Sequence, residues 1–509
     1  MFGSRIREWG PLDWCVAVLI VLALVAGGIY GGSKLLRRCD NGLSEIDGEC
    51  IGVTTKSFEA DDDIGSLLDA IAKENDRVAS ESGTPYVRVA LMTAFTSGDR
   101  SAMTSDMIRR ALAGSLAALE EANDGAGGPQ VQLMLAPIGQ QLDQWKPVIA
   151  KLDTLADDKD HPLVGVTGIP SSQTSTREAL AELTARKLPT VGPVINASSM
   201  NFDYFFKTSP DDKEFANALR HYLDTYPQGK KNGLLLLDRH TGDVYSRDLM
   251  RTLKARFGKD YDLTASPSLF TGSSGSDEGE PGIFFDAVGK ICNQGTDTVF
   301  FAGRDQDLPG FIDALSDEGS CTHGKPLRIL KTGIGLEPTL TRPEVKRDLR
   351  KANATIVDAA SFDPRWEKPG SADRPAGVDD FLDRFNEVRN KHTLGEKPLA
   401  DGYAASYYDG LRLLTEAMKR TFADLNKGQD SEQLPTRQEL YTTLSQSTVN
   451  SSGMLQGATG TYGFAGQDTN DRWSACKPVP VVEFPETRHD KKLPLYRTYD
   501  DGGCSRAAR

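Results

Sequence analysis

The sequence lacks the local motifs by which many enzymes are recognised. It has no HExxH pair, no GxSxG elbow, no Walker A loop and no GxGxxG after a strand pattern. Its six histidines are scattered, and His240, beside Asp238 and Asp243, is the one candidate base near a functional loop. A surface histidine in a polar loop is the simpler interpretation, because catalysis requires a nucleophile and a base within mutual reach. We therefore expect neither enzyme activity nor a cofactor.

Concentrated positive charge and metal-type cysteine spacings are also missing. The 59 Lys and Arg residues are spread along the chain and are outnumbered by 72 Asp and Glu, which gives a formal net charge of -13. This pattern argues against a nucleic-acid partner. No cysteine spacing is a CxxC pair, so we expect no metal site. A length of 509 residues predicts two lobes or domains rather than one core.

One segment near the N-terminus is free of charge over a length that fits a membrane. Residues Trp14 to Gly32 come close to the roughly 20 apolar residues that span the hydrocarbon core. We predict a transmembrane anchor at residues 14–33 after a short cytoplasmic tail at residues 1–13, with a cleavable signal peptide as the alternative. No lipobox precedes Cys15 or Cys39, and positive residues on both sides leave the orientation ambiguous.

Apart from Cys15, which lies in the predicted anchor, the six cysteines fall into three pairs that are local in sequence. An even count in local pairs fits an oxidising compartment, so we expect three disulfides and an extracytoplasmic location for the bulk of the chain. Free buried thiols are the alternative. The expected pairs are Cys39/Cys50, Cys292/Cys321 and Cys476/Cys504. The first would close a collar within residues 34–85, a region that ends in an amphipathic helical pattern over Asp61–Ser80.

From Tyr86 onward, short apolar runs alternate with helical patterns. Such alternation indicates βαβ units and parallel sheets, so we predict an α/β fold. The predicted strands are Val87–Met92, Val131–Ala136, Leu163–Thr167, Thr190–Pro193, Gly233–Leu237, Thr298–Ala302, Leu327–Leu330 and Thr355–Ala359. The predicted helices are Ser105–Asn123, Thr176–Ala185, Lys213–Thr225, Ser246–Phe257 and Leu308–Leu315. Ligands of such sheets sit outside the carboxyl ends of the strands.

Five stretches of the chain, in order, carry a resemblance to a known family. They are LAALEEANDGAGG (116–128), FDYFFKTSP (202–210), DRHTGDVYSRD (238–248), PLADGYAASYYDGLRLLTEAM (398–418) and QGATGTYGF (456–464). Together they resemble the type 1 periplasmic binding protein family, in particular the branched-chain amino-acid type of solute-binding protein from ABC importers. The run of Phe, Lys, Thr and Pro at 206–210 is the most specific match, since it resembles the family's passage from lobe one to lobe two.

The resemblance implies two doubly wound parallel-sheet lobes joined by a three-crossover hinge that closes around a ligand. We place lobe one at residues 86–208 with 355–430, lobe two at 209–354 with 431–484, and a C-terminal tail at 485–509. The expected crossovers are Lys207–Asp211, Asn353–Asp358 and Asp424–Arg437.

The resemblance also implies ligand contacts in lobe one. Ser171 and Ser172 lie in the loop Gly168–Thr176, whose backbone N–H groups and hydroxyls would suit an anionic group. An ordinary helix N-cap is the alternative. Asn196 and Ser198 occupy a second such loop, where a plain turn is the alternative.

Further contacts are expected from lobe two and from the first loop of lobe one. Tyr245 matches the tyrosine that reaches the family's cleft, although a structural role at a helix start is the alternative. Phe95, Asp99 and Asp305 are weaker candidates, and for Asp305 a solvated acidic loop is the alternative. Amino-acid binders of the family have an acid in a later loop of lobe two, which here reads KTGIGL (331–336) with Glu337 displaced. This departure puts an amino-acid ligand in doubt.

The predicted function is therefore an extracytoplasmic solute-binding protein that delivers a small molecule, such as an amino acid, to the membrane subunits of an ABC importer. The alternative is a membrane-anchored extracytoplasmic sensor or scaffold that keeps the fold without transport. In either case the predicted N-terminal helix would hold the chain at the cell membrane.

Overall fold

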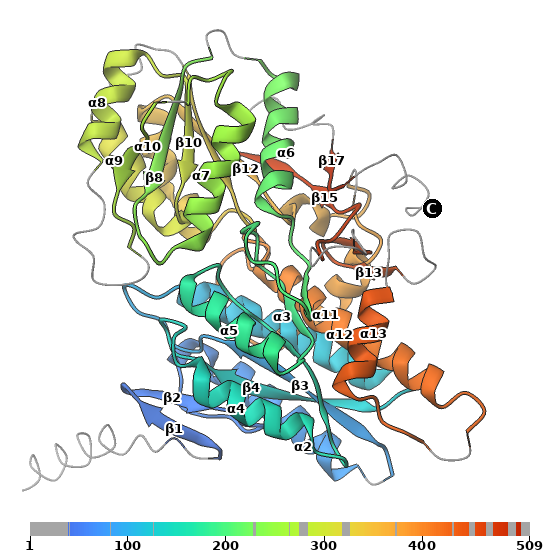
Figure 1. Cartoon of the computed structure of the whole chain (residues 1–509). Helices are drawn as coiled ribbons and strands as arrows, with labels where there is room; N and C mark the ends of the chain where they lie inside the picture. The colour runs from blue at the N-terminus through green and yellow to red at the C-terminus, as the bar shows by residue number, and fades with distance from the viewer. Residues whose placement is uncertain are drawn as a thin grey trace, which may run out of the picture.

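The computed structural model shows two α/β lobes side by side, with the N-terminal segment on one of them (Figure 1). The predicted anchor at 14–33, Cys321 and Cys504 lie outside the described residues. Within those residues, no helix has both the length and the apolar character needed to cross a membrane. The described residues are 39, 41–81, 83–125, 127–227, 231–263, 265–273, 284–317, 326–371, 374–429, 432–446, 454–464, 472–486 and 495–499.

Lobe one is built on a five-stranded parallel sheet in the order β4-β3-β5-β6-β7. Its strands are almost wholly buried, because helices cover a parallel sheet on both faces. The strands are β3 (Tyr86–Thr93), β4 (Gln130–Pro137), β5 (Leu163–Thr167), β6 (Thr190–Gly192) and β7 (Phe205–Lys207). The helices are α2 (Gly65–Ser80), α3 (Ser105–Asp124), α4 (Trp145–Ala156), α5 (Thr174–Ala185), α11 (Val378–Lys391), α12 (Tyr403–Leu425) and α13 (Arg437–Gln446).

Lobe two is built on a six-stranded sheet in the order β16-β12-β11-β10-β8-β9, in which only the edge strand β16 is antiparallel. Two separate apolar clusters form its core. The strands are β8 (Gly233–Asp238), β9 (Ser268–Phe270), β10 (Thr298–Ala302), β11 (Leu327–Thr332), β12 (Ala354–Ala359) and β16 (Val481–Phe484). The helices are α6 (Asp212–Thr225), α7 (Val244–Phe257), α8 (Phe285–Gln294), α9 (Leu308–Asp317) and α10 (Pro343–Lys351).

The lobe boundaries differ from those expected for residues 355–430 and 431–484. Strand β12 belongs to lobe two, because it pairs with β11 over its whole length. Helix α13 belongs to lobe one, where Leu440 and Leu444 join the core. Both ends of the stretch 424–437 therefore lie in lobe one. The chain crosses between lobes at 208–211, at 360–363 and between β14 (Gly460–Tyr462) and β15 (Pro478–Val479).

The third crossing is braced by the other crossing strands and by the chain's C-terminal segment. Lys477 Nζ donates to the carbonyl of Thr208 at 2.8 Å, so the first and third crossings are joined directly. Strand β17 (Tyr496–Arg497) pairs with β15, and Thr498 exchanges backbone hydrogen bonds with Cys476 and Lys477. Cys292 and Cys476 each take part in a disulfide. The tail expected at 485–509 thus contributes part of its length to the hinge.

The N-terminal segment packs along lobe one rather than standing apart as a collar. Its hairpin, β1 (Leu43–Ile46) and β2 (Glu49–Gly52), is closed by the Cys39–Cys50 disulfide. Thr54 exchanges backbone hydrogen bonds of 2.9 and 2.8 Å with Leu135 on the outer strand β4. Asn75 of helix α2 adds two more hydrogen bonds to Leu133 of the same strand. The segment therefore covers the outer edge of the sheet of lobe one.

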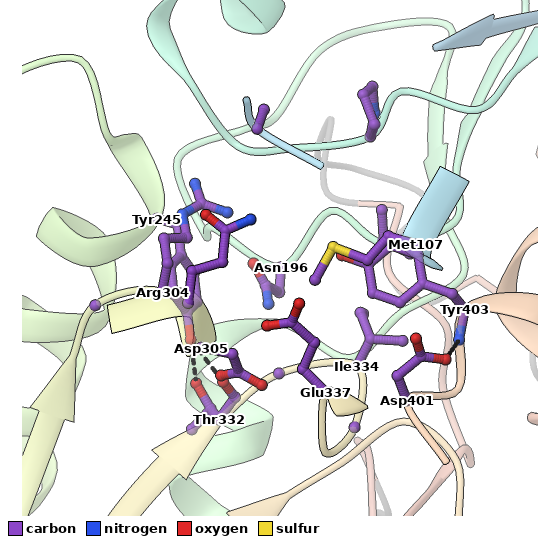
Figure 2. A pocket seen from close by; sticks show the side chains of 17 residues that line it. Met107, Asn196, Tyr245, Arg304, Asp305, Thr332, Ile334, Glu337, Asp401 and Tyr403 are labelled. Atoms are coloured by element: carbon purple, nitrogen blue, oxygen red, sulfur yellow. Dashed lines mark hydrogen bonds between the residues drawn. The ribbon is translucent and has the colours of Figure 1, made fainter. Parts of the chain in front are cut away.

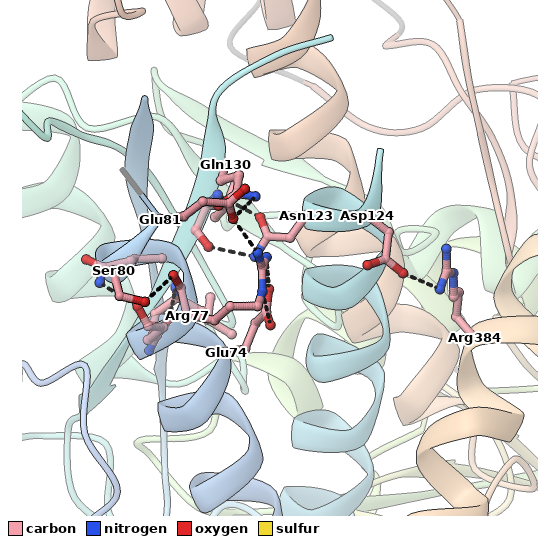
Figure 3. Close-up of polar contacts among 12 residues, drawn as sticks. Glu74, Arg77, Ser80, Glu81, Asn123, Asp124, Gln130 and Arg384 are labelled. Atoms are coloured by element: carbon pink, nitrogen blue, oxygen red, sulfur yellow. Dashed lines mark hydrogen bonds and ion pairs between the residues drawn. The ribbon is translucent and has the colours of Figure 1, made fainter. Parts of the chain in front are cut away.

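Polar contacts fasten helix α2 to its neighbours in lobe one (Figure 3). Asn123 of α3 donates to Glu74 at 2.7 Å, while its side-chain oxygen accepts from the N–H of Val131. Arg77 pairs with Glu74 and Glu81 on its own helix. These contacts connect α2, α3 and the start of β4, so the N-terminal helix is an integral part of lobe one.

Candidate functional site

A cleft between the two lobes holds the candidate site. It comprises about 620 Å³ of space not filled by protein atoms, part of which is open to solvent. Its lining from lobe one is Ala102, Met107, Pro170, Val194, Asn196, Asp401 and Tyr403. Its lining from lobe two is Tyr245, Gly303, Arg304, Asp305, Gln306, Thr332, Gly333, Ile334, Gly335 and Glu337.

Strand topology explains why these residues meet. Pro170, Asn196 and Arg304 follow the carboxyl ends of β5, β6 and β10, and Gly333 follows that of β11. The carboxyl ends of parallel strands meet at one edge of a sheet, and the two sheets present these edges to each other. Figure 2 shows the resulting ring of side chains, with Met107, Asn196 and Tyr403 facing Tyr245, Asp305 and Glu337.

Arg304 is held at the cleft wall by an acid of its own lobe. Its guanidinium donates to both carboxylate oxygens of Asp243, at 3.0 and 2.7 Å, and lies 4.9 Å from the ring centroid of Tyr245. The same guanidinium donates to the carbonyl of Ser172 in lobe one at 3.3 Å. Burial opposes the charge, but Asp243 outweighs it, so the pKa of Arg304 is raised and the group stays cationic.

The loop Gly168–Thr176 of lobe one, which carries Ser171 and Ser172 and is called the serine loop below, is joined to lobe two by direct hydrogen bonds. The N–H of Tyr245 donates to the carbonyl of Ser172 at 3.1 Å, and the N–H of Thr174 donates to the carbonyl of Gly242 at 3.0 Å. Ser171 and Ser172 are buried outside the cleft lining, and their hydroxyls have no hydrogen-bond partner in the described part of the chain. The structure therefore does not bring these two serines into the cleft.

The second predicted loop of lobe one is divided between the cleft and the hinge. Asn196 lines the cleft, as expected, while its backbone carbonyl accepts from the N–H of Asp212 at 2.9 Å. Ser198 lies outside the lining, and its N–H donates to the Asp212 carboxylate at 3.3 Å. Burial raises the pKa of Asp212 well above its usual value. The loop thus joins the cleft to the start of lobe two.

Asp305 lines the cleft as part of a buried ion network. Lys331 Nζ lies 3.2 Å from Asp305 and 2.6 Å from Asp358. Burial raises the pKa of Asp305 to about 6, although the neighbouring Lys331 lowers it. Burial would lower the pKa of Lys331, but the two carboxylates outweigh it and raise that pKa. One ammonium thus serves two carboxylates, so the network carries excess negative charge when both are ionised.

Glu337 reaches the cleft although the sequence suggested that it was displaced. It lies beyond the Gly-rich loop at the start of the turn Pro338–Thr341, and only 1% of its surface is exposed. Its Oε2 atom is without a hydrogen-bond partner among the described residues. Burial, reinforced by the carboxylates of Asp305 and Asp401, raises its pKa to about 8, although the neighbouring hydroxyls of Thr339 and Thr104 oppose this shift. The cleft therefore contains a buried carboxyl group that is not committed to an ion pair.

Tyr245 and Asp401 complete the polar wall. The Tyr245 hydroxyl donates to the carbonyl of Thr332 at 2.6 Å, and burial raises the phenol's pKa well above its usual value. Asp401 pairs with Arg110 at 2.7 Å, with both side chains fully buried. Burial raises the pKa of Asp401, and Arg110 opposes this shift. Unlike Glu337, this second acid of the cleft is already balanced by a cation.

Two predicted residues lie elsewhere. Phe95 is buried in the core against Phe58, and Asp99 is exposed outside the cleft lining. The cause is the N-terminal segment, which holds their loop. Glu49 accepts hydrogen bonds from Thr96 and from the N–H of Gln140, and Asp61 accepts from the N–H and hydroxyl of Ser97.

Sequence reasoning missed Arg304, Thr332, Glu337, Asp401, Tyr403 and Met107. Arg304 had a usable signal, because it follows the end of a predicted strand one residue before Asp305. Asp401 and Tyr403 had a weaker one, since they begin the Tyr-rich helix. Within the described residues, no group of three or more His, Cys, Asp and Glu side chains is arranged to hold a metal ion. The polar groups gathered here are suited to binding a small polar molecule.

Comparisons with known proteins agree with this geometry. Residues 87–473 match the family model described as periplasmic binding protein. No curated protein matches the sequence. Among solved structures, the chain is similar to a branched-chain amino acid transporter substrate-binding protein from Streptococcus pneumoniae in complex with isoleucine. The identity is 15%, the TM-score is 0.53, and 81% of this chain and 99% of that chain are covered.

Two further solved structures share the fold. One is an ABC transporter solute-binding protein from R. palustris in complex with benzoate, with 14% identity, a TM-score of 0.51 and coverage of 82% of this chain and 98% of that chain. The other is a fatty acid ABC transporter substrate-binding protein from Thermomonospora curvata, with 13% identity, a TM-score of 0.53 and coverage of 82% and 94%.

Proposed function

The chain belongs to the periplasmic binding protein family, and on that premise we propose that it captures a small solute between its lobes outside the cytoplasm and delivers it to an ABC importer. The observation that carries this proposal is the cleft, which is lined from both lobes by residues at the carboxyl ends of strands. A ligand that contacts both linings stabilises the closed arrangement relative to the open one. Family membership also supports a binding role rather than a catalytic one.

We propose Asn196 from lobe one and Tyr245, Asp305 and Glu337 from lobe two as ligand contacts. Arg304 shapes the wall beside them while remaining paired with Asp243. The solved structures that share the fold are named as binding isoleucine, benzoate or fatty acid. Their ligands support a small organic solute for this chain too, and their names support the membrane subunits of an ABC importer as its partner.

We further propose that residues 14–33 anchor the chain in the cell membrane, with the lobes outside. The support is the uncharged apolar run and the disulfide that closes the N-terminal hairpin. Membrane fractionation of the full chain tests this proposal. Full-length protein should remain with the membrane after a high-salt wash, whereas a variant with three leucines of residues 18–24 changed to lysine should be lost from that fraction. Equal release of both proteins would contradict it.

A membrane-anchored sensor or scaffold is the second candidate. It is favoured by the hydrogen bonds that join Ser172 and Thr174 of lobe one directly to Tyr245 and Gly242 of lobe two. Such bonds contribute to closure independently of any ligand. A role in transport requires that a permease accept the closed protein, so uptake of a bound solute by cells with and without the chain separates the two candidates.

A thermal-shift screen of the purified chain tests the binding function itself. The panel should cover amino acids, amines, carboxylates, amides, nucleosides and sugars. A ligand present at about 100 times its dissociation constant adds about 2.7 kcal/mol to the free energy of unfolding. At least one class should raise the melting temperature, and Tyr245→Phe and Asn196→Ala should each reduce that rise. A flat response to every class would contradict the proposed function.

A further inference from the structure

The ionised groups around the cleft do not balance. Arg304 is matched by Asp243, and Asp401 by Arg110, through close ion pairs. Lys331 faces two carboxylates, those of Asp305 and Asp358. Glu337 adds a further carboxyl group, which takes part in no ion pair within the described residues. The interior of the cleft therefore has more acid than base, and an anionic ligand would increase this imbalance.

Glu337 is directed at the space that a ligand would fill. Figure 2 shows its carboxyl group extending into the cleft between side chains of the two lobes. The side chain is almost fully buried, and its Oε2 atom has no hydrogen-bond partner among the described residues. A buried polar atom without a partner costs free energy. A ligand that donates a hydrogen bond or carries a positive charge at this position removes that cost.

The part of lobe one suited to a ligand carboxylate is used by the protein itself. The N–H of Thr174, at the start of helix α5, donates to the carbonyl of Gly242 rather than facing the cleft. The N–H of Gln173 is occupied as well, since the Thr176 hydroxyl accepts it at 3.0 Å. Arg304 is already engaged by both oxygens of Asp243. These donors would have to give up existing partners before they could bind a carboxylate. The hydroxyls of Ser171 and Ser172 have no partner among the described residues, but both residues lie outside the cleft lining.

We propose that the cleft selects a small organic cation without a carboxylate group, and that Glu337 is the group that recognises its positive charge. This inference rests on the proposed solute-binding function and names the class of its ligand. The cation donates to Glu337 from within the cleft, where Asn196 and Tyr403 form the facing wall. Specificity against amino acids and carboxylic acids follows from the excess of acid, because a ligand carboxylate is repelled by the carboxyl groups of the cleft.

Ligand binding is coupled to release of a proton. The raised pKa of Glu337 keeps much of this group protonated at neutral pH. An ammonium or guanidinium placed against it favours the ionised form, so the carboxyl proton leaves to solvent as the ion pair forms. The acids Asp305, Asp401 and Tyr403 act on Glu337, and the hydroxyls of Thr339 and Thr104 lie near its carboxyl group. The cations at the cleft, Arg304 and Lys331, are paired with Asp243 and with Asp305 and Asp358, so neither replaces the ligand as the counter-ion of Glu337.

Matched probe pairs test the inference on the full chain. Each pair joins an amine to the amino acid that differs from it by one added carboxylate: isoamylamine with leucine, putrescine with ornithine, and agmatine with arginine. At least one amine should bind at least tenfold more tightly than its amino-acid partner by titration calorimetry at pH 8. In each pair that binds, the amine should be the tighter ligand. Titrations in two buffers of different ionisation enthalpy should show proton release at pH 7.

Glu337→Gln should weaken binding of the amine at least tenfold and abolish the proton release. The matched control Glu344→Gln changes an exposed acid of the same lobe and should leave both unchanged. Tighter binding of an amino acid or of 4-methylpentanoate than of its amine counterpart would overturn the inference and leave the solute-binding function intact. Failure of every class in the broad screen would instead overturn the function. Amine binding that is unchanged in Glu337→Gln would show that Glu337 does not recognise the ligand.

Discussion

The two walls of the cleft use similar residues for different purposes. In lobe one, Asp401 is fully paired with Arg110, and the serine loop is occupied by hydrogen bonds to lobe two. In lobe two, Glu337 is buried to the same degree but takes part in no ion pair within the described residues. Burial raises the pKa of both carboxyl groups, yet only that of Asp401 is opposed by a neighbouring cation. A buried acid with a partner stabilises the fold, whereas one without a partner is available to a ligand.

Removal of Asp401 should have the largest effect on stability. Asp401→Ala removes the close counter-ion of the buried Arg110 guanidinium and leaves only the more distant Asp106 carboxylate at 3.9 Å, so the loss should approach the roughly 3–5 kcal/mol that is typical of a broken buried pair. Urea denaturation at pH 7 should show the loss. The double variant Arg110→Met with Asp401→Leu should recover most of it, because neither charge then remains. A loss below about 1 kcal/mol for the single variant would show that the two acids do not differ as described.

Glu337→Gln should stabilise the folded protein, whereas Asp401→Ala destabilises it. The folded-state pKa of about 8 exceeds the unfolded value near 4.5, so the folded protein binds more protons between these values and loses stability as pH rises through that window. An amide at this position removes the dependence. The variant should gain roughly 4 kcal/mol at pH 8, by the scale of about 1.4 kcal/mol per pKa unit, and little at pH 4. Thermal unfolding across this range measures both, and a variant less stable than the parent at pH 8 would refute the assignment.

Amine affinity should depend on pH through the same group. Below pH 8 the ligand must displace a proton from Glu337, so affinity should fall by up to about tenfold for each pH unit, or about 1.4 kcal/mol. Above pH 8 affinity should level off while the amine stays protonated. Calorimetric titrations of the best amine at pH 6, 7, 8 and 9 give the profile, and Glu337→Gln should flatten it. Affinity that is constant over this range would argue against a titrating partner.

The serine pair of lobe one should have the smallest effect. Ser171→Ala with Ser172→Ala removes two buried hydroxyls that have no hydrogen-bond partner in the described part of the chain. Ligand affinity should change by less than about 0.5 kcal/mol, since the backbone groups that join the lobes remain in place. Calorimetry with the best amine is the measurement. A tenfold loss of affinity would show that these hydroxyls contact the ligand, and it would weaken the contrast between the two walls.

The sheets were largely readable from sequence because their strands are continuous apolar runs. The bounds of β5 and β10, Leu163–Thr167 and Thr298–Ala302, coincide with the predicted runs. Strands β7 and β9, of three residues each, were missed because such short segments give a weak pattern, although the equally short β6 was predicted within Thr190–Pro193. Helix α10 was missed because it is mostly charged and its buried residues are only Val345, Asp348 and Leu349. The fold class was predictable from the alternation of strand and helix patterns. The lobe boundaries depend instead on hydrogen bonding between strands, such as β11 and β12, that no local pattern specifies.

The site was only partly readable for a related reason. Asn196, Tyr245 and Asp305 follow strands or begin helices, and this local position was enough to identify them as candidates. Glu337 was judged by its distance from the strand end, but the turn that follows β11 returns its carboxyl group to the cleft. The carbonyl of Ser172 is held by the guanidinium of Arg304, which is 132 residues away in the sequence. Such pairings across the two lobes leave no local pattern in a sequence.

The cover over strand β4 has a consequence for how copies of this protein meet. Thr54 and Asn75 occupy the outward hydrogen-bonding groups at Leu135 and Leu133. A chain shortened to begin after residue 64 would lose the hairpin and leave this strand partly bare. Bare strand edges pair readily with one another, so two such chains can join their sheets into one and continue to grow. The N-terminal segment thus occupies an edge strand that would otherwise be available for pairing with a second chain.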